Sequence, residues 1–322
     1  MIQDQLLKAL ELALPDKHSL NDAIATALDI SYDAAHRRTS FKSKLSLEES
    51  VILAKYYNIS LDQLYKTTDR QLLVVEKTKP IFNESALQDY FKDSYDSLEP
   101  LLNQNDCSIL YSAKDIPLFY TIGSDLLSKF KIFVWLKLLD ANFETHNFDT
   151  FSLHIDTISY AKRLKELYHN LQTTEIWDIT TINSTLKQIH FYYEASIITT
   201  DVALALCNAL NELIHSISKK MSAQSDIYKL YYNELLLMNN NVLVTTPKIQ
   251  SLYVPFSILS YYQTSDKRTC QQAERYFNQQ LSNSKLLNSS GEKEQRTFFN
   301  KMHQKVDALK QLIEATEQLN YE

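Results

Sequence analysis

The sequence of 322 residues predicts a mainly α-helical protein with two domains. Its two glycines, Gly123 and Gly291, fall far below the usual content of about 7%. All-β folds need a turn about every 8–12 residues, so a chain poor in glycine disfavours them. We expect a five-helix domain in residues 1–70, followed in residues 71–322 by a larger, mainly helical domain with a small antiparallel β-sheet.

The scarcity of glycine also excludes several kinds of site. A phosphate-binding Walker loop, a dinucleotide-binding turn and a G-x-S-x-G nucleophile elbow all need glycine where the backbone bends sharply or approaches a ligand. Two E-x-x-H units, Glu166–His169 and Glu212–His215, have the helical spacing of di-iron ligands. Two such units among eight histidines exceed the number expected by chance only slightly. We therefore predict no enzyme, no cofactor and no metal site.

The chain has no membrane or export signal. Its longest apolar stretch, Ile132–Leu136, lies between two lysines and is far shorter than the roughly 20 residues that span a bilayer. The first residues lack the basic start and apolar centre of a signal peptide. Cys107, Cys207 and Cys270 are widely separated and do not form a disulfide framework. These observations predict a cytoplasmic protein with no membrane partner.

The first seventy residues show five helical patterns. Ile2, Leu6, Leu10 and Leu14 recur on one helical face, and Pro15 ends that helix. Four further helices are expected, over residues 20–28, 32–39, 47–58 and 61–65. Ser19, Ser31, Ser46 and Ser60 stand at the positions of N-caps, and Glu49 completes a capping box with Ser46. Small residues in the second and third helices permit a close crossing.

The third helix leads into a cationic run. Residues 36–44, HRRTSFKSK, contain four lysine or arginine residues and no acid, although the net charge of the whole chain is −6. An acidic protein does not coat nucleic acid with its whole surface, but one local basic face remains compatible with DNA binding. The alternative is that these cations form an ordinary solvated face.

These segments resemble a known family. Ile24-Ala25, Ile30-Ser31, Leu47-Glu48 and the stretch 53–64, LAKYYNISLDQL, are similar to the Cro/repressor-type (XRE) helix-turn-helix domain. The stretch 34–38, AAHRR, followed by 46–49, SLEE, resembles its BetR-like branch in particular. The resemblance covers residues 1–66, about a fifth of the chain. Two positions depart from the pattern: Asp29 replaces the usual turn glycine and Asn21 the usual glutamine.

The resemblance implies that the third helix enters the DNA major groove while the second crosses the backbone. It places Tyr32, Asp33, His36 and Arg37 near the base edges; Asp33 is favourable there only if it accepts from a cytosine amine. The residues expected to hold phosphates are Asn21, Ser31, Arg38, Lys42 and Lys44.

Residues 71–322 show mostly helical patterns, over residues 86–102, 124–139, 157–171, 182–221 and 268–281. Short strands are expected at 234–238, 242–246 and 249–254, with asparagines 239–241 in a turn. Two apolar seams run along helices: Val202, Leu206, Ala209 and Leu213, and a second from Phe299 to Thr316. The pattern of the first seam is more typical of a buried core than of a dimer contact. The second fits a helix partner within the chain or across a dimer equally well.

The sequence as a whole predicts a DNA-binding transcription regulator. Its partners are double-stranded DNA, a second copy of the chain in a homodimer, and a small-molecule or protein effector of the C-terminal domain. The alternative is a protein-interaction adaptor that uses the helix-turn-helix scaffold without binding DNA. The aromatic pairs, Tyr261-Tyr262 among them, are more typical of core or rim than of a ligand pocket.

Overall fold

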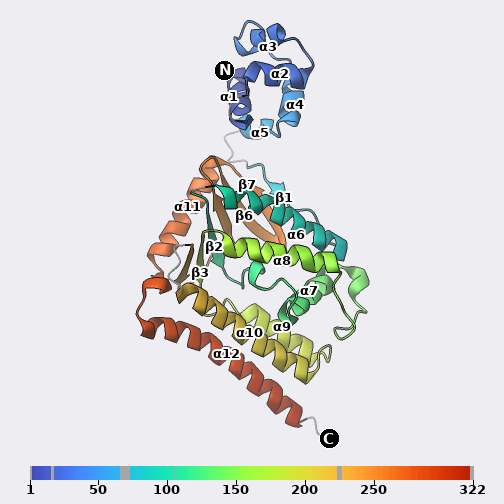
Figure 1. The fold of residues 1–322 in the computed structure, drawn as a ribbon, viewed down its shortest axis with the longest axis vertical. Coiled ribbons are helices and arrows are strands. Elements are labelled where there is room, and N and C mark those ends of the chain that lie inside the picture. Colours follow the sequence, from blue (N-terminus) through green and yellow to red (C-terminus); the bar gives the residue numbers. More distant parts are fainter. Residues whose placement is uncertain (1, 16–17, 66–72, 105, 223–226, 320–322) are drawn as a thin grey trace. The chain divides into compact units, whose positions relative to one another are not determined.

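The computed structural model describes residues 2–15, 18–65, 73–104, 106–222 and 227–319. The chain forms two compact units, which divide between Val75 and Glu76. The predicted boundary after residue 70 lies outside the described residues. Figure 1 shows the two units, and each is considered by itself.

Unit 1 has five helices among the residues that the structure describes. They are α1 (Ile2–Ala13), α2 (Leu20–Leu28), α3 (Tyr32–Thr39), α4 (Leu47–Tyr56) and α5 (Leu61–Leu64). Their core is the apolar cluster Leu6, Leu7, Leu10, Ile24, Ala35 and Leu53. The capping box of Ser46 and Glu49 is present as predicted. Ser19 stands at the N-cap of α2, but its side chain makes no capping hydrogen bond, contrary to expectation.

Unit 2 is built around an eight-stranded sheet among its described residues. The strands are β1 (Glu76–Lys77), β2 (Ser108–Ala113), β3 (Thr173–Trp177), β4 (Tyr228–Tyr232), β5 (Val242–Thr245), β6 (Gln250–Ser257), β7 (Ser260–Thr264) and β8 (Lys285–Leu286). Their order is β1-β7-β6-β5-β2-β3-β4-β8. Neighbours β2, β3 and β4 are parallel, and the other pairs are antiparallel.

The expected fold of a mainly α domain with a small antiparallel sheet is therefore wrong: unit 2 has a large mixed sheet. Strands β5 and β6 lie where strands were expected. The predicted strand at 234–238 is not one, because β4 ends at Tyr232 and Asn233 starts a turn in which its side chain accepts from the amide of Leu235. Strands β2 and β3, in the centre of the sheet, were not expected at all.

Helices cover both faces of the sheet (Figure 1). They are α6 (Glu84–Leu98), α7 (Leu126–Leu139), α8 (Ile155–Asn170), α9 (Asn183–Glu194), α10 (Thr200–Ser222), α11 (Lys267–Ser282) and α12 (Glu292–Leu319). Helix α11 places Cys270 and Phe277 against Leu243 and Leu252 on one face. The larger cluster, to which α6, α7, α8, α10 and α12 contribute, covers the other face.

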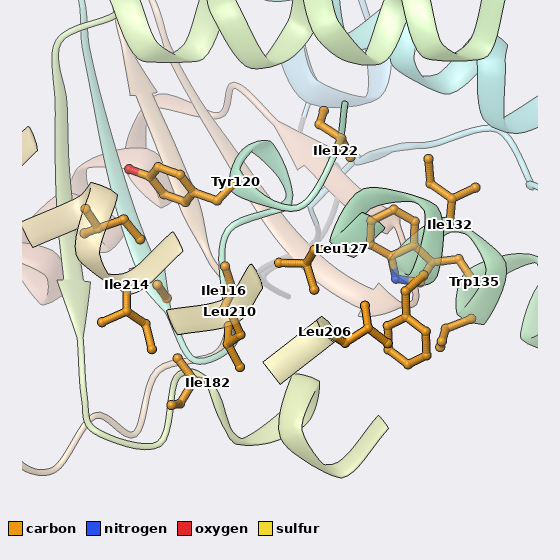
Figure 2. Close-up of a cluster of buried hydrophobic side chains, with 14 of the residues drawn as sticks. Ile116, Tyr120, Ile122, Leu127, Ile132, Trp135, Ile182, Leu206, Leu210 and Ile214 are labelled. Carbon is orange, nitrogen blue, oxygen red and sulfur yellow. The ribbon is translucent and has the colours of Figure 1, made fainter. Parts of the chain in front are cut away.

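The single helical pattern over 182–221 is two helices in the structure. The chain turns between α9 and α10, where Ser196 has a φ of 54° in the left-handed region. Figure 2 shows Leu206, Leu210 and Ile214 of α10 gathered in the main core with Leu127 and Trp135 of α7. The break therefore lets α10 turn back onto the core.

Both apolar seams face the protein's own interior. Phe299, Met302, Val306, Leu309 and Ile313 of α12 are buried in the main core, and α12 packs against α10. On α10, Leu206 is buried, and Val202, Ala209 and Leu213 pack against the same core. Neither seam is available to a second copy of the chain.

Across the described part of the chain, no helix has the length and apolar character needed to cross a bilayer. The three cysteines are buried and form no disulfide.

Candidate functional site

The turn between α2 and α3 has the geometry of a tight helix-helix junction. Asp29 ends α2 with φ 53° and ψ 50°, the left-handed conformation that glycine adopts most easily. Its amide donates to the carbonyl of Ala25. Ser31 then caps α3 by accepting from the amide of Ala34 at 3.3 Å. The position that departs from the family pattern thus keeps the conformation that the turn requires.

The residues expected to read bases lie on the outer side of α3. Tyr32, Asp33, His36 and Arg37 are all exposed. Tyr32 and Asp33 fall in the first turn of the helix, and the other two lie about one turn further on. A helix that reads the major groove uses its N-terminal side chains in this way. The structure therefore gathers the four predicted base readers on accessible surface.

Asn21 connects α2 to both ends of α3. Its amide group donates to the hydroxyl of Tyr32 at 3.1 Å, and its carbonyl oxygen accepts from the hydroxyl of Thr39 at 2.6 Å. These bonds hold Tyr32 in place on the surface of α3. Asn21 already uses both functions of its side chain within the protein, so it positions Tyr32 and is not the free polar group expected for a phosphate contact.

Arg38 is not a free cation. Its guanidinium donates to one carboxylate oxygen of Glu49, from Nε at 3.1 Å and also from Nη2, and Nη1 donates to the carbonyl of Ala34 at 2.8 Å. The hydrogen bond to Glu49 raises the pKa of Arg38, and the same bond lowers the pKa of Glu49. Arg38 therefore fastens α3 to α4, and its cation is neutralised within unit 1.

The loop after α3 presents two exposed lysines, Lys42 and Lys44. One residue of α1, Gln3, fixes this loop: its amide donates to the carbonyls of Arg38 at 2.8 Å and Ser43 at 3.2 Å, and its oxygen accepts from the amide of Leu45 at 3.1 Å. The sequence offered no sign of this role, because Gln3 lies about forty positions from its partners.

Unit 2 contains a cavity of about 540 Å³ between α6 and the sheet, which we call the α6 cavity. Its floor is formed by strand residues Ile109, Tyr111, Val242, Val244, Tyr253, Tyr261 and Gln263. The register pairs Ile109 with Val244, and Tyr111 with Val242, which pairs in turn with Tyr253. Cross-strand partners point to the same face of a sheet, so these side chains form one continuous apolar and aromatic surface.

The other walls of the α6 cavity come from α6 and from two loops. Helix α6 contributes Ala86, Asp89, Tyr90, Asp93, Ser94 and Ser97. Leu118 and Phe119 close one end, and Thr78, Lys79, Pro80 and Phe82, which follow β1, close another. The volume lies within the range of roughly 300–1,000 Å³ that is usual for small-molecule sites. The sequence favours core or rim positions for the tyrosine pairs, whereas one member, Tyr261, lines this cavity.

A buried acidic network lies behind this cavity. Glu175 is 0% exposed and accepts hydrogen bonds from the hydroxyls of Tyr120 at 2.8 Å, Tyr168 at 2.7 Å and Tyr228 at 2.9 Å, and from the indole of Trp177 at 2.8 Å. Burial raises the pKa of Glu175, while the three tyrosine hydroxyls and Lys220 oppose that effect. Phe119 stacks on Tyr168 with ring centroids 3.9 Å apart. The network therefore supports the Phe119 wall of the cavity.

His169, one of the two E-x-x-H histidines, sits beside this network. Its Nδ1 is 3.3 Å from the ammonium of Lys220. Burial, with Lys220 and Lys165 nearby, lowers the pKa of His169 to about 4. No three His, Cys, Asp or Glu side chains come together as a metal-binding group within the ranges that the structure describes.

A second cavity, of about 580 Å³, lies where β2 and β3 end. Its polar lining includes Lys114, Thr180, Asn183, Ser184, Lys187 and Gln188. Lys114 is already occupied, because its ammonium lies 3.3 Å from Asp178 and 3.1 Å from the carbonyl of Leu236. Nearby Lys131 is buried and donates to Gln188 at 2.9 Å. Burial lowers its pKa. These bonds tie Lys114 and Lys131 into the fold.

Comparison of the chain with protein-family models, with curated proteins and with solved structures finds no match.

Proposed function

We propose that the protein is a sequence-specific DNA-binding transcription regulator in which α3 is the recognition helix. The observation that carries the proposal is the junction of α2 and α3. A tight turn at Asp29 presents Tyr32, Asp33, His36 and Arg37 on accessible surface, next to exposed lysines in a run without acids. In this proposal the first-turn residues and His36 contact base edges in the major groove.

In this proposal the residues that contact phosphates differ from those expected from the sequence alone. Lys42 and Lys44 are exposed and hold phosphates, joined by Arg37 at the edge of the groove. Ser31 caps α3 and contributes to the same region. Arg38 and Asn21 support the interface from within unit 1, because their side chains are engaged by Glu49, Tyr32 and Thr39.

The proposal includes two copies of the chain on DNA. One small helix-turn-helix unit buries limited surface, and such domains gain affinity when two copies bind half-sites about one helical turn apart. Both predicted seams are used inside unit 2, so the contact between copies involves other surface. Mass measurement of the full chain in solution and on its selected DNA tests this part. A single copy in both states would contradict it.

The experiment for DNA binding selects sequences from random duplex DNA and then measures affinity for the selected duplex at several salt concentrations. Replacing Lys42 and Lys44 by alanine should lower affinity and flatten the slope of log K against log salt by about 0.9 for each lost contact. Lys55→Ala, an exposed lysine of α4 outside the proposed face, is the matched control. Recovery of no preferred sequence would contradict the proposal.

The adaptor alternative is favoured by a different observation. Three large apolar side chains near α3 are exposed: Tyr32 by 51%, Phe41 by 44% and Leu47 by 81%. Large exposed apolar side chains are available for contact with a protein partner. If the selection fails and a protein partner is retained without DNA only when these three residues are intact, the adaptor function is the better account.

A further inference from the structure

The α6 cavity separates apolar and charged side chains. Its floor consists mainly of aliphatic and tyrosine side chains, with Gln263 of β7 as a neutral polar member and no charged residue. Burial raises the pKa of Tyr111 and Tyr253, so these phenols stay neutral at physiological pH. The charged residues of the lining, Lys79, Asp89 and Asp93, all belong to its rim. An apolar body with one polar end fits this distribution better than a molecule that is polar throughout.

The rim has an excess of negative charge. Lys79 and Asp93 neutralise each other, with their nitrogen and oxygen 2.9 Å apart. Asp89 is exposed and has no ion-pair partner within 4.0 Å in the described part of the chain. Because Asp89 and Asp93 are one helical turn apart on α6, both carboxylates lie along the same side of the opening. An anionic head group would meet this repulsion, whereas a cationic one would pair with Asp89.

We propose that the α6 cavity binds an amphipathic cation, a molecule with an apolar or aromatic body and an amine head group. The body lies against Tyr111, Tyr253 and the valines of β5, and the ammonium pairs with Asp89 at the rim. The tyrosine rings of the floor also attract a cation that approaches their faces. Ligand binding itself does not depend on DNA binding by unit 1.

The position of the cavity connects ligand binding to unit 1 through the chain. Thr78 lines the cavity and follows β1, the first strand of unit 2. Its amide donates to the carbonyl of Tyr261 at 3.1 Å, and its hydroxyl accepts from the amide of Tyr261 at 3.0 Å. A ligand that contacts Thr78 and Tyr261 stabilises this attachment, at the point where the chain arrives from unit 1. We infer that the ligand is an effector, a role that rests on the proposed function.

The first test measures binding to the full chain with N-phenyl-1-naphthylamine, a neutral fluorescent probe for apolar cavities. Decylamine, decanol and decanoate, each below its micelle concentration, then compete with the probe. They share one chain length and differ in charge. We expect decylamine to compete about fivefold more strongly than decanol, in line with one partly exposed ion pair, and decanoate to be the weakest. Absence of probe binding, or decanoate competing as well as decylamine, would overturn the proposal.

Two matched pairs of variants locate the binding. Ser94→Phe fills the cavity from α6 and should abolish probe binding, whereas Ser85→Phe, on the same helix outside the cavity, should leave it intact. Asp89→Asn should remove the preference for the amine while the probe still binds, and Asp96→Asn should keep that preference. The asparagine variants alter only exposed side chains, so the test stands even if Ser94→Phe does not fold. A preference that survives in Asp89→Asn would overturn the assignment of the head group.

The effector role is tested separately by measuring DNA affinity with and without decylamine in the full chain and in Ser94→Phe. A change of affinity in the parent but not in the variant supports the role. Decylamine binding with no effect on DNA affinity would overturn the effector role alone. Probe and amine binding without any selected DNA sequence would overturn the proposed function and leave the ligand assignment in place.

Discussion

Arg38 and Glu49 form a bridge between α3 and α4, and the same glutamate completes the capping box of α4. One oxygen of Glu49 accepts from the Arg38 guanidinium, and the other accepts from the amide of Ser46 at 2.9 Å. The bridge is part-buried, with about a fifth of each side chain exposed. The presentation of α3 thus depends on a residue that belongs to the next helix.

Arg37 and Arg38 should therefore respond differently to replacement by alanine. Arg37→Ala should weaken DNA binding and reduce its salt slope by about 0.9, with little change in stability. Arg38→Ala removes charge-assisted hydrogen bonds and leaves Glu49 without its partner, so the free energy of unfolding of unit 1 should fall by about 1–3 kcal/mol. Circular dichroism and salt titrations of the two single variants check this. Equal loss of stability in both would contradict the assignment.

Asp29 is the residue whose replacement by glycine should stabilise unit 1. Its left-handed conformation costs an ordinary residue about 1–2 kcal/mol, and glycine adopts it freely. Asp29→Gly should raise the free energy of unfolding by about 0.5–1 kcal/mol. Asp22→Gly is the control, because Asp22 lies in helical backbone within α2 and should lose stability instead. Chemical denaturation measures the free energy of unfolding of both variants. A change of the same sign in both would refute the strain argument.

Charged substitutions in α12 should unfold unit 2. Val306 is 0% exposed in the main core, so Val306→Asp buries an unpaired carboxylate, and Leu309→Asp does so at its edge. We expect aggregation or loss of the cooperative transition, and no folded monomer. Leu312→Asp, on a side chain of the same helix that is 48% exposed, should leave the protein folded. Gel filtration and tryptophan fluorescence distinguish these outcomes.

Unit 2 should lose stability in mild acid because of His169. The pKa of His169 is about 4 in the folded chain and about 6.5 in the unfolded chain. Between these pH values the imidazole is therefore protonated only when the chain is unfolded. The neutral His169 therefore contributes its full share to the free energy of unfolding above pH 6.5. This share falls by about 2–3 kcal/mol as the pH decreases to 4. His169→Gln should flatten this dependence. Both tryptophans, Trp135 and Trp177, lie in unit 2 and report its unfolding in the full chain. An unchanged slope in the variant would exclude His169 as the cause.

The helices were predictable because their signals are local. Leu20–Leu28 and Tyr32–Thr39 have the predicted bounds, since apolar spacing and the flanking residues Ser31 and Asp29 are read within a few positions. The residues of α3 that the resemblance to helix-turn-helix domains assigns to base contacts are exposed in the structure. The bridge between Arg38 and Glu49 could not be predicted in this way, because eleven residues separate the two partners. Arg38 also fitted a phosphate contact, and Glu49 also fitted the capping box.

The centre of the sheet depends on contacts that no local pattern reveals. Strand β3 has the sequence TTEIW, in which Glu175 lies between Thr174 and the apolar Ile176. Its carboxylate is tolerated there because Tyr120 and Tyr228, which lie 55 and 53 residues away, donate to it. The α6 cavity was likewise unpredictable, since its floor combines residues from four strands that meet only in the folded sheet.

The order in which the strands are synthesised differs from their order in the sheet. Thr78, just after β1, pairs with Tyr261, which is made 183 residues later. Unit 1 therefore leaves the ribosome and can fold long before β7 exists, whereas β1 has to wait without its partner. A chain truncated before residue 260 would retain the whole of unit 1 but lack the part of the α6 cavity floor that Tyr261 supplies. If α3 binds DNA and the α6 cavity binds an effector, as proposed, such a product would bind DNA and be insensitive to the effector.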